Sequence, residues 1–479
     1  MKLCKETYSD YKKFPEKVLQ FGEGNFLRAF VDWQIDRMNK ITGFNGSVVV
    51  VQPIENGLVD VLNAQDGLFT LVLQGFKDGK PAREYSVINS ISRGVNPYRD
   101  YDEYLKLAKM PELRFIISNT TEAGIVFDES DKFDDRPPKS FPAKLMVFLY
   151  ERFKAFGGDE SKGFIIIPCE LIDRNGEELK KAVLKYAGLW NLGSDFINWL
   201  NNGNVFCCSL VDRIVTGYPK DAEKIWDELG YEDRLLDTAE FFHLWVIEVP
   251  DFVKYEFPAE QAGLNVKFVN DIAPYRERKV KILNGAHTAL TSVALQYGIG
   301  TVKDALNDNL VKDFIKGLIY EEIIPSLTLP ESELKEFAET VLERFANPFI
   351  EHSLASIALN SVSKFKTRNL PSLIDFAALK GFLPKRLVFS LASLITFYGD
   401  EKMPLNDDTA VLEFFKGLWS SFDGQNFGMI AKNTLGQKDF WEMDLNKIPN
   451  LTEITAKYIE KIKKSGIKEA LKKVSGDAK

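Results

Sequence analysis

The stretch Val18–Leu27 reads VLQFGEGNFL and decides the fold predicted for the first half of the chain. Its first four residues form a short apolar run, typical of a buried strand, which leads directly into Gly22 and Gly24. The apolar spacing that follows predicts a helix over about residues 25–40, and the run Ser47–Val51 (SVVVV) predicts a second buried strand. A strand, a glycine turn, a helix and a second strand in this order open a dinucleotide-binding unit.

The two glycines have a physical reason in such a unit. Gly22 permits a tight turn, Gly24 lets a pyrophosphate approach the backbone, and the N-terminus of the following helix supplies amide donors. Leu27 stands where a third glycine would be, which predicts looser packing of the helix against the strand. The same spacing would also fit an ordinary strand-to-helix turn. The candidate cofactor-binding residues of this stretch are Val18, Leu19, Gln20, Phe21, Gly22, Glu23, Gly24, Asn25, Phe26, Leu27, Arg28 and Ala29.

Two further segments bear on the cofactor. The second strand runs into QPIE at residues 52–55, where Glu55 is a candidate for the ribose hydroxyls; no Arg or Lys stands there for a 2′-phosphate, which favours NAD over NADP. Arg114–Asn119 (RFIISN) predicts a third strand, and small polar residues follow it where a nicotinamide ribose would lie. The candidates are Ser118, Thr120 and Thr121, although a strand end followed by a helix cap explains them equally well.

A second stretch, Lys279–Leu290 (KVKILNGAHTAL), carries a lysine, an asparagine and a histidine at i, i+5 and i+8. On an α-helix at about 100° per residue, with Lys279 as the origin, His287 lies at about 80° and Asn284 at about 140°, so all three point into one broad face. An amine, an amide donor and an imidazole on one face could run a proton-coupled reaction at a carbonyl or carbinol carbon. A solvated helix face or a cap would show the same residue types.

The periodicity of the sequence changes along the chain. Strand-like runs dominate the first half, and periods of three to four residues dominate after about residue 290, as in Leu387–Phe397. We therefore predict an α/β fold with two domains: an N-terminal Rossmann-like dinucleotide-binding domain over residues 1–274 and a mostly α-helical substrate-binding and catalytic domain over residues 275–479. Thr238–Glu248 (TAEFFHLWVIE) alternates enough to be predicted as one strand of the first domain.

The composition excludes several classes of protein. The 479 residues are 45% hydrophobic and 27% charged, which is ordinary for a globular protein with two cores. The net charge of −8 argues against non-specific binding of nucleic acid or anionic membranes. Four cysteines without CxxC spacing and only three histidines predict no metal site. With no secretory signal and no membrane-spanning run, we expect a reduced, cytoplasmic protein. The sequence makes no prediction about oligomeric state.

Seven short motifs are spread over nearly the whole chain. They are GEGNFLR at 22–28, TTEAG at 120–124, NG at 175–176, VDRI at 211–214, WVIE at 245–248, KVKILNGAH at 279–287 and RFANP at 344–348. With these motifs the chain resembles the polyol-specific long-chain dehydrogenases, the mannitol dehydrogenase family. The Lys-x4-Asn-x2-His signature of that family is intact at Lys279, Asn284 and His287.

The resemblance implies a role for each residue of the signature. It implies that Lys279 is the general acid when a ketone is reduced and the base in the reverse direction. Asn284 would donate to the developing oxyanion, and His287 would orient a substrate hydroxyl. Asp212 would support the site from the nucleotide-binding domain. The chain departs from the pattern at Leu171, because polyol members usually read Cys-Asp-Asn where this chain has CEL at 169–171, so one oxyanion donor is lost.

Within the family, the chain is most similar to members that reduce D-tagaturonate to D-altronate with NADH, which implies a hexuronate or aldonate substrate. A uronate carboxylate needs a cationic partner. The candidates are Arg276 and, from the run KFKTR at 364–368, Lys364, Lys366 and Arg368, although a solvated face explains each of the last three about as well. Activity on fructuronate, or on a polyol such as mannitol, stays open, because the uronates differ only in stereochemistry. A catalytically silent NAD-binding sensor is an alternative of a different class, although a sensor needs no proton donor.

Overall fold

A computed structural model describes residues 1–121 and 123–476 of the chain. It divides into two compact units, Met1–Ile272 and Ala273–Lys479. The sequence had placed this boundary after residue 274. The first unit contains parallel sheet flanked by helices, and the described part of the second contains helices and no named strand. The predicted α/β class, a Rossmann-like domain followed by a helical one, is confirmed.

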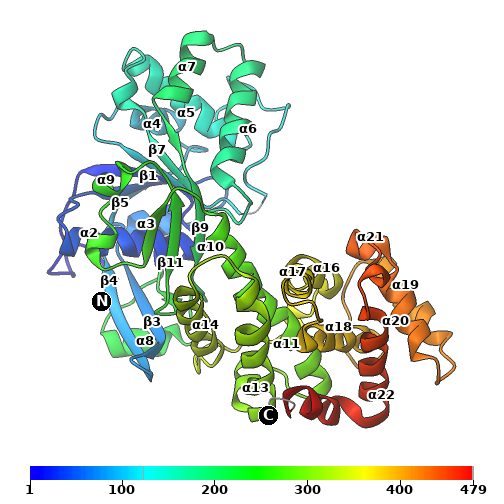
Figure 1. The fold of residues 1–479 in the computed structure, drawn as a ribbon. Coiled ribbons are helices and arrows are strands. Elements are labelled where there is room, and N and C mark those ends of the chain that lie inside the picture. Colours follow the sequence, from blue (N-terminus) through cyan, green and yellow to red (C-terminus); the bar gives the residue numbers. More distant parts are fainter. Residues whose placement is uncertain (122, 477–479) are drawn as a thin grey trace. The chain divides into compact units, whose positions relative to one another are not determined.

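The first unit is built on a six-stranded parallel sheet with the order β5-β2-β1-β6-β7-β8 (Figure 1). The strands are β1 (Glu16–Phe21), β2 (Ser47–Val51), β5 (Ile91–Val95), β6 (Phe115–Ser118), β7 (Ile165–Pro168) and β8 (Val205–Phe206). The chain leaves β1 towards β2 on one side and returns to β6 on the other, so the strand order reverses at β1. In doubly wound sheets, ligands bind at the carboxyl ends of the strands at such a reversal.

Both faces of this sheet are buried, which explains its continuous apolar runs. Val48 and Val50 face one core, whereas Val49 and Val51 face the other. The first core is completed by the helices α2 (Trp33–Ile41) and α3 (Val59–Ala64). The second is completed by α4 (Tyr101–Leu107), α5 (Phe141–Ala155), α6 (Asn175–Leu189) and α7 (Ser194–Asn202), which Figure 1 shows gathered together. The sheet is therefore covered by helices on both sides.

Two three-stranded sheets complete the first unit. In one, β3 (Phe69–Lys77) and β4 (Lys80–Ile88) form a hairpin, and β10 (Asp237–Ala239) pairs with β3. In the other, β11 (Leu244–Glu248) lies between β9 (Cys208–Asp212) and β12 (Val266–Val269). The single strand predicted over residues 238–248 is therefore wrong. Its two halves pair in different sheets, and alternation along the chain does not reveal the partner of a strand.

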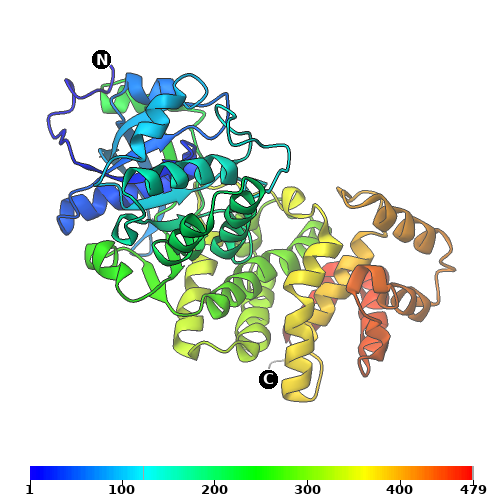
Figure 2. The same ribbon diagram turned by 90° about the horizontal axis from the view of Figure 1, so that it is seen from above.

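The described part of the second unit consists of helices joined by loops, as the yellow-to-red part of the ribbon in Figure 2 shows. The longest apolar run lies in α18 (Lys385–Phe397), which is buried on nearly all sides and packs against α11 (Gly285–Tyr297) and α22 (Leu451–Gly476). The other helices are α10 (Ala273–Arg278), α12 (Val302–Asn307), α13 (Asn309–Gly317), α14 (Glu331–Phe345), α15 (Leu354–Ile357), α16 (Ser361–Arg368), α17 (Leu370–Lys380), α19 (Thr409–Ser420), α20 (Phe427–Leu435) and α21 (Lys438–Trp441). None of the described helices has the length and apolarity needed to cross a membrane.

Within the described part of the chain, three helical segments are π-helical rather than α-helical, at Arg28–Asp32, Lys279–Asn284 and Leu318–Ile323. The first interrupts the helix predicted after the glycine turn, which runs from α1 (Asn25–Leu27) to α2. The second covers the first half of the stretch Lys279–Leu290, for which 100° per residue was assumed. A π-helix bonds i to i+5 and has more residues per turn, so the predicted angles do not hold there. π-Helical turns are frequent at functional sites.

Candidate functional site

The turn after β1 is built around Gly22. Its φ of +118° is a conformation that L side chains rarely adopt, and its N–H donates to the carbonyl of Val51 at 3.1 Å. A Cβ added at Gly22 would come within 2.9 Å of Leu27 Cδ1 and 3.1 Å of the Asn119 carbonyl oxygen. Leu27 is only 1% exposed and belongs to the core. The loose packing predicted at the third glycine position is therefore not found, because Leu27 fills that space.

At Gly24, unlike Gly22, the backbone conformation does not require a glycine. Its φ of −68° is open to any residue, and a Cβ added there would meet nothing within 4 Å. It precedes the helix that begins at Asn25, and no side chain caps that helix end. A bare, exposed backbone at a helix N-terminus suits the close approach of a phosphate group. The residues present therefore fit the pyrophosphate of a dinucleotide.

The other candidates in this stretch support the turn from within. Val18, Leu19, Phe21 and Ala29 are fully buried core residues. Gln20 is also buried, and its Nε2 donates to the carbonyl of Gly22 and to Asp32 Oδ2, both at 3.1 Å. Burial raises the pKa of Asp32 to about 7, and the hydrogen bond from Gln20 opposes that shift. Gln20 thus links the glycine turn to the π-helical segment.

Glu23 ties the glycine turn to the loop after β2. Its Oε1 accepts from the N–H of Leu58 at 3.2 Å, and burial raises its pKa. A Cβ at Gly57 would lie 2.0 Å from that same oxygen, so the two segments touch. Glu55 is exposed in this loop, and its carbonyl accepts from Gln52 Nε2 at 2.8 Å. The loop that carries the candidate ribose ligand is thereby folded onto the end of β2.

The polar residues after β6 gather around Glu170, a residue that the sequence did not single out as a site residue. Ser118 Oγ donates to Glu170 Oε2 at 3.0 Å, and Thr120 donates to Oε1 through both its N–H and its hydroxyl at 2.9 Å. Glu170 is 2% exposed, and burial raises its pKa. Thr121 follows with a φ of +74°. A glutamate directly after an apolar strand was the available signal, since a buried carboxylate needs donors.

The ends of β7 and β9 are joined by one buried amide. Asn175 Nδ2 donates to the carbonyls of Pro168, Glu170 and Ser209, each at 3.0 Å, and its Oδ1 accepts from the N–H of Ser209 at 2.8 Å. Asp212, the last residue of β9, is buried and pairs across the sheet with Leu244. Leu171, by contrast, is 60% exposed at the end of β7.

In the second unit, Lys279 and Asn284 begin and end a π-helical segment, and both are half-buried. His287 follows in α11, stacked on Phe345 with ring centroids 4.0 Å apart. A second histidine that the sequence did not single out, His352, meets His287 edge-on at 5.1 Å, and burial lowers its pKa. The imidazole of His287 is therefore fixed by two rings from outside its own helix.

Other charged groups hold the π-helical segment in place. Lys281 is buried between Glu277 at 2.6 Å and Asp375 at 2.8 Å. Arg278 pairs with Glu333 at 2.7 Å, whereas Arg276 is exposed. At the end of the segment, the fully buried Asn369 donates to the carbonyl of Gly285 at 2.9 Å. Lys281 and Arg278 thus have carboxylate partners on or against this helix.

Lys364 and Arg368 differ from those cations. Lys364 Nζ donates to the carbonyl of Ile357 at 2.9 Å, and Arg368 Nη1 donates to Thr288 Oγ1 at 3.3 Å, beside His287. Within the described chain, neither forms an ion pair with a carboxylate, whereas Lys366 between them pairs with Glu442 at 2.9 Å. Burial lowers the pKa of Lys364 and of Arg368, and Arg368 lowers that of Lys364 further. Two half-buried cations one helical turn apart can together bind an anion.

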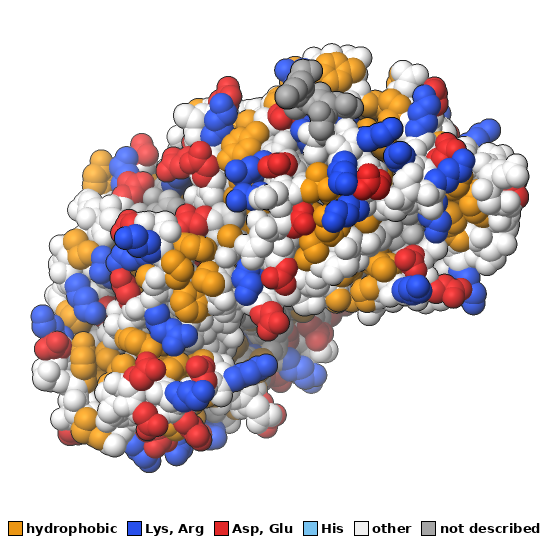
Figure 3. Space-filling view, turned by 90° about the horizontal axis from the view of Figure 1, so that it is seen from below, with side chains coloured by type: hydrophobic (Ala, Val, Ile, Leu, Met, Phe, Trp, Pro, Cys, Tyr) orange, Lys and Arg blue, Asp and Glu red, His pale blue; other side chains and the backbone are white. Residues whose placement is uncertain are grey.

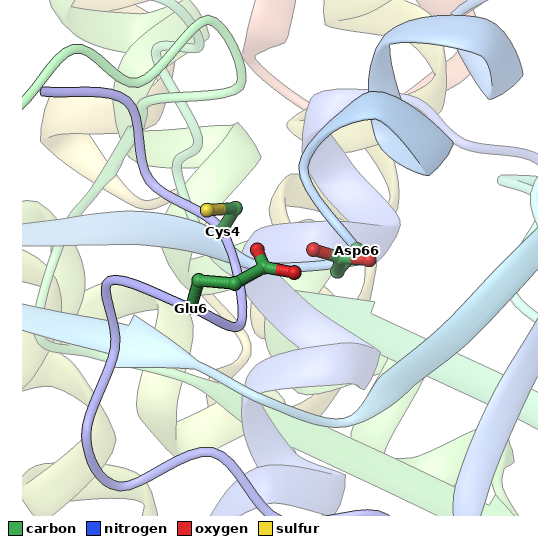
Figure 4. Close-up of side chains that lie close together, drawn as sticks. All are labelled: Cys4, Glu6 and Asp66. Carbon is green, nitrogen blue, oxygen red and sulfur yellow. The ribbon is translucent and has the colours of Figure 1, made fainter.

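One cluster of potential metal ligands occurs among the described residues. Cys4, Glu6 and Asp66 lie close together near the N-terminus (Figure 4). The carboxylate of Asp66 is already paired with Lys5, whose Nζ and backbone N–H each donate to one of its oxygens at 3.1 Å.

On the face drawn in Figure 3, Lys and Arg are interspersed with Asp and Glu rather than gathered into a stripe.

Comparison with known proteins gives a consistent result. The family described as "Mannitol dehydrogenase Rossmann domain" matches residues 16–261, and "Mannitol dehydrogenase C-terminal domain" matches residues 271–463. A Bacillus subtilis protein named altronate oxidoreductase is 54% identical over 471 residues, covering 98% of this chain and 97% of that protein. An Escherichia coli protein of the same name is 50% identical over 468 residues, covering 96% and 97%.

Two solved structures share the fold at low identity. One is the ternary complex of Pseudomonas fluorescens mannitol 2-dehydrogenase with NAD and D-mannitol, with a TM-score of 0.70, 24% identity and full coverage of both chains. The other is D-sorbitol dehydrogenase in substrate-free form, with a TM-score of 0.82, 22% identity and coverage of 98% of this chain and 100% of that one.

Proposed function

Because the chain belongs to the mannitol dehydrogenase family, we propose that it is an NAD-dependent oxidoreductase that interconverts D-tagaturonate and D-altronate. The observation that carries this proposal is the near-complete alignment, at 54% and 50% identity, with two relatives named altronate oxidoreductase. Reduction converts a ketone, NADH and a proton into a secondary alcohol and NAD⁺. The substrate is a small hexuronate or aldonate.

We assign the cofactor to the carboxyl ends of β1 and β6, where the strand order reverses. Gly24 and the helix that begins at Asn25 hold the pyrophosphate, because the backbone there is open to close approach. Ser118, Thr120 and Thr121 would lie on the nicotinamide side of the cofactor, and Glu170 fixes the first two. NAD(H), when bound, supplies or accepts the hydride.

The proton is assigned to Lys279. When the carbonyl carbon of the substrate receives a hydride, its oxygen becomes an alkoxide, and the Lys279 ammonium gives it a proton; oxidation runs the same transfer backwards. Asn284 donates a hydrogen bond to the developing oxyanion. His287, held by Phe345 and His352, orients a substrate hydroxyl. A lysine donor makes a metal ion unnecessary for this step.

The uronate carboxylate is assigned to the two cations of α16. Arg368 is the stronger candidate, because it bonds to Thr288 beside His287 and its guanidinium matches a carboxylate with two parallel hydrogen bonds. Lys364 adds a second positive charge. Arg276 stays a candidate at the exposed start of the signature helix. A polyol lacks this carboxylate, so the pair would separate hexuronates from polyols.

Steady-state assays of NADH oxidation with D-tagaturonate, D-fructuronate and D-fructose test the proposal. We expect kcat/KM for tagaturonate to exceed that for the other two by about a hundredfold or more. A preference for fructuronate would assign the chain to mannonate formation, and a preference for fructose would make it a mannitol-type dehydrogenase. NADH binding without turnover of any of the three would identify a sensor instead.

A further inference from the structure

Arg28, the first residue of a π-helical segment, has its guanidinium buried directly beneath the glycine turn. The residue is 1% exposed. Its Nη1 donates to the carbonyl of Glu23 at 2.8 Å, and its Nη2 donates to Asn25 Oδ1 at 2.8 Å. Glu23 and Asn25 are the two neighbours of Gly24 in the chain. The planar fork of the guanidinium therefore joins the backbone before Gly24 to the side chain after it and leaves Gly24 itself uncovered.

Contacts distant in sequence hold this guanidinium in turn. Nη2 also donates to the carbonyl of Leu235 at 3.4 Å and lies 3.5 Å from Asp237 Oδ2, which is fully buried on β10. Burial raises the pKa of Asp237 to about 7, and Arg28 acts against that shift. The ring of Phe69 on β3 packs 5.6 Å from the guanidinium carbon. The small sheet of β10, β3 and β4 thus anchors Arg28.

The turn is fixed on its outer side as well. Asn25 packs on Gly217, where an added Cβ would lie 2.4 Å from Asn25 Nδ2. Gln20 Nε2 donates a hydrogen bond to the carbonyl of Gly22. The backbone on both sides of Gly24 is therefore held by side chains, while nothing lies within 4 Å of the space that its own side chain would take. A site whose parts are fixed before binding loses less entropy when the ligand arrives.

We propose that Arg28 is a positioning residue for the cofactor: by bridging Glu23 and Asn25, it holds Gly24 in the conformation that receives the pyrophosphate of the dinucleotide. This inference rests on the proposed cofactor site. It differs from a direct contact, because the guanidinium is buried and its Nη1 and Nη2 both donate to protein acceptors. It also explains why a buried cation stands beneath an anion site without reaching its surface.

Arg28→Lys separates positioning from structural support. A lysine keeps a positive charge opposite Asp237 but cannot bridge Glu23 and Asn25 at once. We expect the dissociation constant for NADH, measured by fluorescence titration, to rise about tenfold, since the hydrogen-bonded bridge between Glu23 and Asn25 is broken. The turnover number at saturating NADH should change by less than about threefold.

Arg152→Lys is the matched control. Arg152 is also 1% exposed in the same unit, and its fork also binds backbone carbonyls, among them those of Leu113 at 3.0 Å and Lys162 at 2.9 Å. The four carbonyls that it binds all lie outside the glycine turn. This variant should lower the melting temperature at least as much as Arg28→Lys and leave the NADH dissociation constant within about twofold of the parent. An equal rise in both variants would mean general loosening and overturn the inference.

Asn25→Ala keeps the question decidable if Arg28→Lys does not fold. It removes one acceptor of the fork at an exposed position, so the fold should persist. We expect a rise of about threefold in the NADH dissociation constant. In the Arg28→Lys background, where that variant folds, Asn25→Ala should add little, because both changes break the same bridge. Unchanged NADH binding in either single variant contradicts the positioning role.

Gly24→Val distinguishes this inference from the proposed function on which it rests. If Gly24→Val binds NADH normally, the cofactor is not held at this turn and the proposed site itself fails. If Gly24→Val abolishes binding while Arg28→Lys leaves it unchanged, only the role of Arg28 fails.

Discussion

The glycine turn of the first unit and the Lys279–His287 stretch of the second are both short, polar and close to a π-helical segment, yet their geometries have different origins. At the turn, the local chain imposes the shape: Gly22 takes a φ of +118°, and Gly24 leaves the backbone bare. In the second stretch, every residue from Lys279 to His287 is helical, and the type of helix decides where each side chain points. The conformation of a turn can therefore be predicted from its residues. Predicting which side chains share one face of a helix also requires knowing whether the helix has α or π hydrogen bonding.

Their supports differ as well. The turn is held by residues of its own unit, of which Gln20 and Arg28 lie within a few positions of it. The helical stretch is held by Asn369, Asp375 and Phe345, all more than fifty positions away in the chain. Substitutions at the turn should therefore affect cofactor binding, and substitutions in the helical stretch should affect chemistry and substrate. Three experiments test this division, and a fourth tests how the support of the turn affects stability.

Lys279→Ala should have the largest effect. We expect turnover to fall by about 10²–10⁴-fold, because general acid catalysis is lost, while the NADH dissociation constant stays unchanged. A small added amine should restore part of the rate. His287→Ala should mainly raise the KM for the sugar acid and leave measurable turnover. Near-native turnover in Lys279→Ala, together with an inactive His287→Ala, would reverse the two roles.

Gly24→Val should have the next largest effect, and it should affect cofactor binding at the glycine turn rather than chemistry. We expect the NADH dissociation constant to rise on the order of a hundredfold, because the valine side chain fills the space offered to the pyrophosphate. The melting temperature should hardly move, since a Cβ at Gly24 meets no neighbour and its φ of −68° suits any residue. Gly24→Ala should show a smaller rise. Normal NADH titration of the valine variant would refute the assignment.

Arg368→Gln should have an intermediate effect confined to the substrate. Loss of a charged hydrogen-bonding partner should raise the KM for tagaturonate by about 10–100-fold, with little change in NADH binding. Discrimination against fructose should fall in parallel, because fructose has no carboxylate. Lys366→Gln is the control, since Lys366 lies on the same helix and is already paired with Glu442. Equal effects of the two substitutions would argue against Arg368 as the carboxylate partner.

Asp32→Asn should have the smallest effect, and it concerns stability. Burial raises the pKa of Asp32 from its ordinary value of 3.8 to about 7, so the protonated form suits the folded state. The stabilisation is full below about pH 4 and is lost as the pH rises towards 7. An asparagine does not titrate and can still accept from Gln20. The variant should gain about 1–2 kcal/mol over the parent between pH 5 and pH 8, measured by urea unfolding. A pH-independent difference would contradict this explanation.

Much of the fold was readable in short apolar runs. Strands were predicted at Ser47–Val51 and Arg114–Asn119, and the structure has β2 and β6 there, because strands buried on both faces need continuous apolar residues. The β3–β4 hairpin was not predicted, although Asp78-Gly79, with φ values of 52° and 72°, is a typical hairpin turn. The split of residues 237–248 between two sheets could not be predicted, since it depends on strands far away in the chain.

The sequence by itself determined the α/β class and the family, because apolar periodicity, the glycine turn and the Lys-x4-Asn-x2-His spacing are local properties of the chain. Only the tertiary structure decided that Lys279–Asn284 is π-helical, that Ser118 and Thr120 donate to Glu170, and that His352 meets His287. It likewise decided that Arg28 turns inwards to Asp237, which lies more than two hundred positions away. The physical reason is common to these cases: a buried polar group takes the partner that folding brings within hydrogen-bonding distance, and nothing in the local sequence names that partner.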